Sequence, residues 1–285
     1  MIWAIVSKAE MDSFGSNHVI GFYSEVIGRN NIQLAVIDET DELDFVNSDD
    51  VVLLRTASRT IIETIKRKGL VSTAEDYMNY RLVADKVNFS NFLISAGVKV
   101  PRQYRYDEIE EGKAYFVKPR FGCDSNGISP TSICHTKLDV KRQVARIKDD
   151  LLQDVVIEDF IDGKEYTVAC IKQDGSLNTY AVEVDCSKTN GIQVRDCKVG
   201  FMQYLTAVND NTIKGISCKV FNLMSLKHHA RIDFRKDLNG ELYVIDVNLL
   251  PGLGPINYFA RCLLLSRNIS YTDTIKMVIN TATTF

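Results

Sequence analysis

Residues 230–248 read ARIDFRKDLNGELYVIDVN, and this stretch decides how the rest of the chain is interpreted. Its two halves are strand-like and meet at Asn239-Gly240, a dipeptide that favours a β-hairpin because both of its residues tolerate positive φ. If the loop contains only these two residues, Asp233 lies directly opposite Asp246. Side chains alternate across a strand with a period of two, so the two aspartates occupy one face of the hairpin.

The two faces of this hairpin differ in chemistry. The apolar face predicts a core contact and carries Ile232, Phe234, Tyr243, Ile245 and Val247. The polar face adds Arg231 and Asn248 to the aspartates. Like charges opposed on a sheet destabilise it unless a cation compensates them, and carboxylate and amide oxygens are the ligands that Mg²⁺ prefers. A solvated edge hairpin with acids on its wet side is the alternative.

A second candidate piece is YFVKPRFGCDSNGI at residues 115–128. Lys118 stands near the end of an apolar strand, and a buried lysine is costly unless it meets an anion. Gly122 and Gly127 bracket small polar residues that include Ser125, and the backbone N–H groups of such a loop can surround phosphates. No Lys-Ser/Thr pair follows Gly127, so this is not a Walker A loop. By itself the piece is at least as consistent with a structural turn.

The third piece is VVIEDFIDGKEYTV at residues 155–168. An apolar strand leads to Glu158 and then to an extended segment, Asp159-Phe160-Ile161, whose backbone can line an adenine slot. Glu165 is then placed to accept a hydrogen bond from a ribose hydroxyl. Taken alone, a strand-turn-strand with surface acids explains this piece better.

Composition limits the classes of protein to consider. The chain has 285 residues, of which 45% are hydrophobic and 25% charged, which excludes disordered and low-complexity classes and suggests about two domains. A net charge of -3 argues against nucleic acid as a partner. Seven cysteines without a C-x-x-C pair indicate reduced thiols, so we expect a cytoplasmic protein. No run approaches the ~18 apolar residues of a membrane span and no basic leader is present, so we expect neither export nor membrane insertion.

Apolar runs at residues 2–6, 32–37 and 51–54, with helices at 17–27 and 58–68, predict a small α/β unit. A long helix is expected after Val71 and ends at Gly97. Beyond it, strands separated by turns favour antiparallel sheet, with a second hairpin turn at Asp174-Gly175. The expected strands are 115–118, 155–161, 166–171 and 179–184, and the expected helices are 137–152, 256–266 and 272–280.

In this order, the three pieces resemble the ATP-grasp superfamily, most of all its D-alanine-D-alanine ligase branch, over roughly residues 71–285. The resemblance implies an α/β (α+β) fold in which two α+β subdomains clamp ATP. It places a Rossmann-like α/β domain at 1–70, a nucleotide subdomain or lid at 71–157, and a catalytic, metal-binding subdomain at 158–285.

The resemblance also implies roles for individual residues. Lys86 and Lys118 would grip the nucleotide phosphates, with the loop of Gly122, Ser125 and Gly127 around them. The family's hinge, in which a glutamate is followed by a G-x-E triplet, is matched by Glu158, Gly163 and Glu165, so Glu158, Asp159 and the backbone of Phe160 and Ile161 would hold adenine while Glu165 holds ribose. The R-x-D and E-x-N strands of the family match Arg231 to Asp233 and Asp246 to Asn248, which implies ATP with two Mg²⁺ ions, or Mn²⁺ in their place, bound by Asp233, Asp246 and Asn248.

Three features depart from the family pattern. Asp246 stands where glutamate is usual, and Glu10 has no confident match to the amino-terminal glutamate of the family. After Pro251-Gly252, the stretch Gly254 to Asn257 replaces the usual Thr/Ser-rich product contact. With the short length of the chain, these departures argue against D-alanyl-D-alanine as product and favour a ligase of specialised small-molecule or peptide biosynthesis.

The implied activity is an ADP-forming carboxylate-amine ligase that works through an acyl phosphate, with Arg231 and Lys118 as catalytic residues. Expected substrates are amino acids or short peptides, contacted by Arg55, Arg195 and Gly252. Lids are expected at Gly122–Gly127 and Ser187–Gly200, and a homodimer is compatible with this interpretation. An ATP-binding module without ligase activity, or a kinase of a small carboxylate or hydroxyl substrate, is the alternative.

Overall fold

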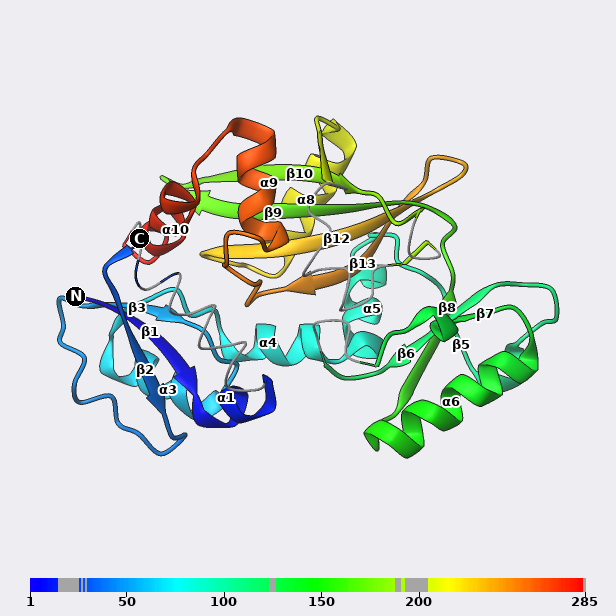
Figure 1. Ribbon diagram of the computed structural model, residues 1–285, viewed down its shortest axis with the longest axis horizontal. Coiled ribbons are helices and arrows are strands. Elements are labelled where there is room, and N and C mark those ends of the chain that lie inside the picture. The colour runs from blue at the N-terminus through cyan, green and yellow to red at the C-terminus, as the bar shows by residue number, and fades with distance from the viewer. Residues whose placement is uncertain are drawn as a thin grey trace.

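The computed structural model describes residues 1–14, 26, 28, 30–122, 127–187, 191–192 and 205–283, and contains three β-sheets with helices packed on them (Figure 1). The architecture is mixed α/β, which confirms the predicted fold class. Within these ranges, no helix combines the length and the apolar character that crossing a membrane requires. The division into domains at residues 70/71 and 157/158 stays a prediction.

The first sheet is parallel, with strand order β2-β1-β3-β4. Its strands are β1 (Ile2–Ser7), β2 (Ile32–Ile37), β3 (Val51–Leu54) and β4 (Val71–Ser72), and its helices include α1 (Lys8–Phe14) and α3 (Arg59–Lys68). The three predicted strands and the helix at 58–68 are confirmed. Helix α3 ends at Gly69, whose φ of 63° is the left-handed C-cap conformation that glycine adopts without strain. Most of the helix predicted at 17–27 lies outside the described residues.

The single long helix predicted between Val71 and Gly97 is wrong. Two helices, α4 (Tyr77–Ala84) and α5 (Lys86–Ser95), meet at Asp85, whose φ and ψ of −98° and 98° are extended. The Asp85 carboxylate accepts the backbone N–H groups of Val87 and Asn88 and caps α5. Arg120 also binds this carboxylate through two hydrogen bonds of 2.9 and 2.8 Å, so a distant strand end fixes the break.

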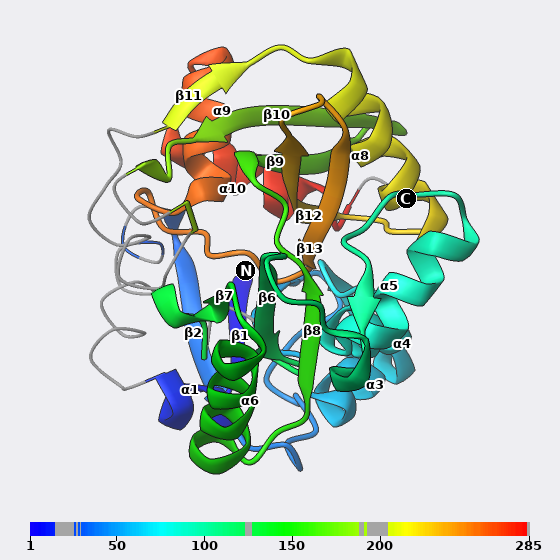
Figure 2. The ribbon, with the colours of Figure 1, turned by 90° about the vertical axis from the view of Figure 1, so that its right-hand side faces the viewer.

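The second sheet is antiparallel, with strand order β5-β8-β6-β7, and helix α6 (Lys137–Leu151) packs on it. Its strands are β5 (Gln103–Tyr104), β6 (Tyr115–Pro119), β7 (Ile133–Cys134) and β8 (Val155–Asp159), with short 3-10 turns at Tyr106–Glu108 and Pro130–Ser132. Figure 2 shows α6 lying along β6 and β8. The buried side chains of this layer, which include Val117, Val140, Ile147 and Ile157, form their own apolar cluster.

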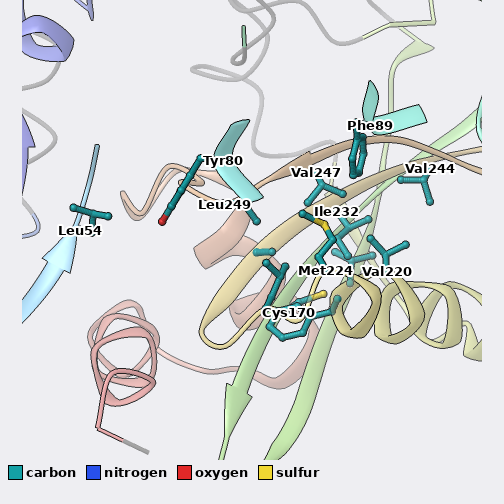
Figure 3. Packing of buried hydrophobic residues seen from close by; sticks show 14 of the residues in the cluster. Leu54, Tyr80, Phe89, Cys170, Val220, Met224, Ile232, Val244, Val247 and Leu249 are labelled. Atoms are coloured by element: carbon teal, nitrogen blue, oxygen red, sulfur yellow. The ribbon is translucent and has the colours of Figure 1, made fainter. Parts of the chain in front are cut away.

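The third sheet is antiparallel and has the order β11-β10-β9-β12-β13. It consists of β9 (Gly163–Gln173), β10 (Ser176–Val184), β11 (Leu205–Val208), β12 (His229–Asp237) and β13 (Leu242–Asn248). Helix α8 (Asn211–Leu223), which the sequence reasoning missed, covers one face, while α9 (Tyr258–Arg267) and α10 (Tyr271–Asn280) confirm the two predicted terminal helices. Figure 3 shows Val220 and Met224 beneath Ile232, Val244 and Val247.

The two predicted hairpin turns have different outcomes. Gln173 pairs with Ser176 across Asp174-Gly175, and both central residues have positive φ, 49° and 74°, as a type I′ turn requires. The loop at Asn239-Gly240 is longer than predicted, because the N–H of Asp237 bonds to the carbonyl of Glu241 and leaves three residues between them. Gly240, at φ 88°, ends this loop.

A bulge between the hairpin strands changes which side chains of β13 lie on the apolar face, so part of the predicted face is wrong. Phe234 pairs with Val244, whereas Asp233 pairs with Asp246, so Ile245 is the extra residue on β13. Val244 is therefore buried in the core, and Tyr243 and Ile245 are only half-buried instead of forming the predicted apolar face. The apolar cluster under this hairpin also contains Leu54 and Tyr80, which joins the third sheet to the first.

Candidate nucleotide and metal site

The polar face of the β12-β13 hairpin brings together the residues that the sequence singled out for a metal. Asp233 pairs directly with Asp246, and Arg231 with Asn248, as predicted. On its other side β12 pairs with β9, where Thr167 lies opposite Asp233. Three strands therefore present oxygen ligands from rigid, hydrogen-bonded backbone at one place.

Asp233 is held from two directions. The Arg231 guanidinium donates three hydrogen bonds of 2.8 to 3.2 Å to its carboxylate, and the Thr167 hydroxyl donates one of 2.5 Å. The Arg231 side chain is buried, so this ion pair forms where solvent screens little. Thr167 was not predicted as a site residue, although its place two residues after Glu165 on the same strand is the signal that indicates it.

Asn248 organises the backbone that follows β13. Its side-chain oxygen accepts the backbone N–H of Leu250 at 2.8 Å, which fixes the entry to the turn at Pro251-Gly252. No group of three or more His, Cys, Asp or Glu side chains in the described ranges can hold a metal ion. The donors at this place are two carboxylates and one amide, which fit a hard cation that takes its remaining ligands from phosphate and water.

Lys118 and Glu158 form a buried ion pair on adjacent strands β6 and β8, with 2.5 Å between Nζ and Oε1. Burial raises the pKa of Glu158, and the charges of Lys118 and Lys86 oppose that rise. The carboxylate of Asp246 acts in the same direction as burial. The influence of Asp246 on Glu158 indicates that the Asp246 carboxylate lies near the Lys118-Glu158 pair.

Lys86 is the first residue of α5 and reaches the loop after β6. Its Nζ donates to the carbonyl of Gly122 at 2.6 Å, and its backbone N–H bonds to the carbonyl of Arg120. Gly122 has φ 108°. A Cβ at Gly127 would lie 2.5 Å from Leu151, so that end of the loop requires glycine. Ser125, with residues 123–126, lies outside the described residues.

Asp159 is the last residue of β8, and neighbouring side chains bind its carboxylate. The Asp159 carboxylate accepts hydrogen bonds from Tyr104 at 2.9 Å and pairs with Lys113 at 2.7 Å. The backbone N–H of Phe160 bonds to the carbonyl of Ala114. The Asp159 carboxylate is therefore engaged by Tyr104 and Lys113, and the role of Asp159 in nucleotide binding stays a prediction.

Glu165 is buried and lies opposite Arg235, with which it forms an ion pair of 3.2 Å. The Cys186 thiol lies 3.8 Å from the same carboxylate oxygen, and burial raises the pKa of that thiol, so it stays protonated. Sequence reasoning missed Arg235. Its position on β12, two residues beyond Asp233 and thus on the same face, is the pattern that indicates it.

The residues predicted to contact substrate are only partly brought to the site. Arg55, at the end of β3, is buried and donates to the carbonyls of Leu250 and Pro251 at 3.3 and 2.8 Å. Its Nε and Nη1 have no partner among the described residues. A Cβ on Gly252 would lie 2.8 Å from the Asn257 side chain, so this glycine lets the turn close. Arg195, and the predicted lid residues 188–190 and 193–200, lie outside the described residues.

Glu10, in α1, comes close to Arg55 at the carboxyl edge of the first sheet. Burial raises the pKa of its carboxyl, while the Ala57 N–H, at 3.1 Å, and the charge of Arg55 lower it. No role was predicted for Glu10, because the residues around it differ from the family pattern. The pairing of β1 with β3 places both residues at one sheet edge.

The family model and two related proteins that match this chain carry the description D-alanine–D-alanine ligase. The family model described as "D-ala D-ala ligase C-terminus" matches residues 87–280. The D-alanine–D-alanine ligase B of Clostridium perfringens is 28% identical over 197 residues, which cover 65% of this chain and 60% of that protein. The ligase of Geobacillus thermodenitrificans is 27% identical over 216 residues, 68% of this chain and 58% of that protein. The chain thus spans about 60% of the length of these relatives.

Two solved structures share the fold. A D-alanine–D-alanine ligase from Bacillus anthracis complexed with ATP superposes with a TM-score of 0.72 at 17% identity, covering 99% of this chain and 97% of that one. The VanG D-Ala:D-Ser ligase from Enterococcus faecalis has a TM-score of 0.70 at 15% identity, with 99% and 98% covered. At such identities the likeness establishes the fold.

Proposed function

The chain belongs to the D-ala D-ala ligase C-terminus family, and on that premise we propose that it is an ATP-dependent ligase that joins a carboxylate to an amine and releases ADP and phosphate. The observation that supports this most is the convergence of Lys118 and Glu158 with Asp246. Two different sheets contribute a cation and carboxylates to one place, although Lys118 and Asp246 are far apart in sequence. A nucleotide carries both an adenine amino group and a phosphate chain, and this set complements both.

The chain holds the nucleotide through complementary charge. Glu158 accepts from the adenine amino group, and Lys118 and Lys86 bind the phosphates. The backbone of Phe160 and Ile161 faces the base, and Glu165 accepts from the ribose. The Glu158 carboxyl lies in a hydrogen-bonded ion pair with Lys118, and a charge-assisted pair of this kind fixes the geometry of both side chains.

Asp233, Asp246 and Asn248 are proposed to hold two Mg²⁺ ions. When bound, such ions neutralise the phosphate oxygens during phosphoryl transfer and orient the chain of phosphates for in-line attack. The protein's own contribution is to fix these oxygens on two paired strands, β12 and β13. Arg231 and Thr167 orient Asp233, so that the ligand geometry exists before substrate binds.

The reaction proceeds in two displacements. A substrate carboxylate oxygen attacks the γ-phosphorus and the bond to ADP breaks, which leaves an acyl phosphate. An amine then attacks the acyl carbon, phosphate departs, and the amine proton passes to water. Arg231 lies on the metal face and stabilises the negative oxygen of the tetrahedral intermediate, while Lys118 stabilises the transferring phosphoryl group.

The substrates are proposed to be amino acids or short peptides. Two nitrogens of Arg55, Nε and Nη1, have no partner in the described ranges, and a substrate carboxylate would supply acceptors for them. Gly252 allows the turn to pack on Asn257, in a stretch whose composition differs from that of enzymes that make D-alanyl-D-alanine. We therefore assign the chain to specialised small-molecule or peptide biosynthesis.

A panel of amino acids and dipeptides, assayed for ADP release and product mass, tests the proposal. A ligase gives ADP release that depends on substrate, together with a product heavier than either substrate. A stable phosphorylated product instead identifies a kinase, and nucleotide binding without stimulated ADP release identifies a binding module. The Asp233→Asn variant is the control for the site, because it removes a charged ligand and leaves the shape of the side chain.

A further inference from the structure

A buried arginine that has no assigned role occupies the centre of the hinge. Arg235 lies on β12 with its guanidinium 5.0 Å from the centre of the Phe160 ring. Its Nη1 donates to the Glu165 carboxylate at 3.2 Å and to the carbonyl of Gly191 at 2.6 Å, and its Nη2 donates to the carbonyl of Gly163 at 3.1 Å. One side chain thus joins the hinge glycine, the candidate ribose ligand and the turn that follows Cys186.

We propose that Arg235 is a positioning residue that makes the site selective for ribonucleotides, because it aims the Glu165 carboxylate at the ribose hydroxyl groups. This inference rests on the proposed nucleotide site. The two oxygens of a carboxylate can accept hydrogen bonds from both the 2′- and the 3′-hydroxyl. Glu165 and Arg235 are both buried, so solvent screens their ion pair little.

The geometry favours a positioning role over simple packing. Arg235 lies directly across from Glu165 in the β12-β9 register, so the pair forms on rigid backbone. The two carbonyl contacts fix the plane of the guanidinium, and the ring of Phe160 supports its face. Because the fork of an arginine is planar, its three fixed contacts determine which way the Glu165 carboxylate points.

The backbone around the pair is equally constrained. The Gly191 N–H bonds to the carbonyl of Cys186 at 3.0 Å, which closes the turn whose carbonyl Arg235 binds. Gly163 has φ 148°, and a Cβ there would lie 2.0 Å from the carbonyl oxygen of Lys236. The Gly163 carbonyl therefore belongs to backbone with little room to move. The Nε of Arg235 has no acceptor among the described residues.

Titration calorimetry with ATP and with 2′-deoxyATP, in buffer containing Mg²⁺, tests this role without any need for the ligase substrates. The wild-type protein is expected to bind ATP about tenfold more tightly than 2′-deoxyATP, since a hydrogen bond to a charged group is lost. In Arg235→Met this ratio falls to about twofold or less, and Arg235→Lys, which still reaches Glu165, lies between them.

Two further variants separate positioning from general damage. Glu165→Gln is expected to lose the same discrimination, and Glu165→Gln combined with Arg235→Met should lose no more than Glu165→Gln alone, because both changes act on one interaction. Lys164→Met is the matched control. It removes the neighbouring exposed ion pair with Glu183, 3.0 Å long, and should leave the ratio unchanged. Thermal unfolding of every variant checks that each is folded.

Three results would overturn the inference. They are equal binding of ATP and 2′-deoxyATP by the wild-type protein, full discrimination by a folded Arg235→Met variant, and additive losses in the double variant. Binding of neither nucleotide contradicts the proposed nucleotide site as well. Failure of every substrate in the ADP-release panel contradicts the ligase proposal only, and the binding ratios still decide the role of Arg235.

Discussion

Asp233 lies directly opposite Asp246, although the hairpin loop between their strands is one residue longer than Asn239-Gly240. The bulge at Ile245 shifts the register back by one residue and restores the opposition. Two one-residue offsets therefore cancel between the loop and the metal face. The pairing of the carboxylates is set by the bulge as much as by the turn, which connects local strand geometry to the proposed chemistry.

The first prediction concerns the charge and the side-chain length of Asp246 as a proposed metal ligand. Asp246→Asn removes a charged metal ligand and should lower ATP turnover by about 100-fold or more, because charge neutralisation of the phosphates is lost. Asp246→Glu keeps the charge, extends the ligand by one methylene and should retain turnover at a changed Mg²⁺ requirement. ADP release measured across a range of Mg²⁺ concentrations checks both, and equal activity of Asp246→Asn and wild type would contradict the assignment.

The second prediction concerns the buried pair of Lys118 and Glu158. Lys118→Ala leaves the Glu158 carboxyl buried without its cation, so the pKa of Glu158 rises further and the affinity for MgATP should fall by about 100-fold. Arg105→Ala removes an exposed ion pair with Asp107 in the same part of the chain and serves as control. Titration calorimetry measures both, and wild-type affinity in Lys118→Ala would rule out this role.

The third prediction is a pH dependence that arises at Glu75. This buried carboxylate accepts the backbone N–H groups of Lys227 and His228, and burial raises its pKa from 4.5 to about 7. The folded state therefore binds more protons than the unfolded state in that interval. The free energy of unfolding that Glu75 contributes falls by about 3 kcal/mol as the pH rises from 4.5 to 7.

The pKa of His228 is shifted in the opposite direction to that of Glu75, so the two groups change the stability with opposite dependence on pH. The Glu75 effect must therefore be measured as a difference between variants. Burial lowers the pKa of His228 from 6.5 to about 4, so its contribution to stability is lost as the pH falls through that range. The quantity to compare is the difference in free energy of unfolding between wild type and Glu75→Gln, measured by denaturant titration at several pH values. Glu63→Gln, at an exposed position, is the control. A difference that stays constant between pH 4.5 and 7 would contradict the assignment to Glu75.

The fourth prediction compares two glycines. Gly163→Ala places a Cβ 2.0 Å from the carbonyl oxygen of Lys236, so the hinge must move. At Gly175, with φ 74°, no atom lies within 4 Å of the new Cβ, and only the left-handed backbone costs energy, about 1 kcal/mol. Thermal unfolding should show a clearly larger loss for Gly163→Ala, and MgATP affinity should fall in that variant only. A larger loss for Gly175→Ala would refute the packing argument.

The sequence predicted those parts of the fold that local patterns determine. The hairpin at Asp174-Gly175 follows from a dipeptide that accepts positive φ, and the strands around Lys118 and Glu158 follow from apolar runs. These two features depend on neighbouring residues, so they can be read without tertiary contacts. The opposition of the two aspartates was predicted from a two-residue loop, and it holds because the bulge at Ile245 cancels the extra residue of the loop.

Other features depend on residues far apart in the chain. The break between α4 and α5 is fixed by Arg120, 35 residues after Asp85, and no local pattern in the helix reveals that contact. The three-residue loop and the bulge at Ile245 compensate each other, so the sequence alone cannot distinguish them from a two-residue loop. Arg235 was not predicted for a similar reason. Its hydrogen-bond partners are Gly163, Glu165 and Gly191, which lie on other segments of the chain.

The most direct test of the account follows oxygen from the carboxylate substrate to phosphate. The protein is incubated with MgATP and amino acids whose carboxylates carry ¹⁸O, and the phosphate released is examined by mass spectrometry. Attack of the carboxylate on the γ-phosphorus, followed by displacement by the amine, predicts phosphate that carries one ¹⁸O, and Asp233→Asn should abolish its formation. Release of phosphate without ¹⁸O while a carboxylate–amine product accumulates would contradict the acyl-phosphate mechanism.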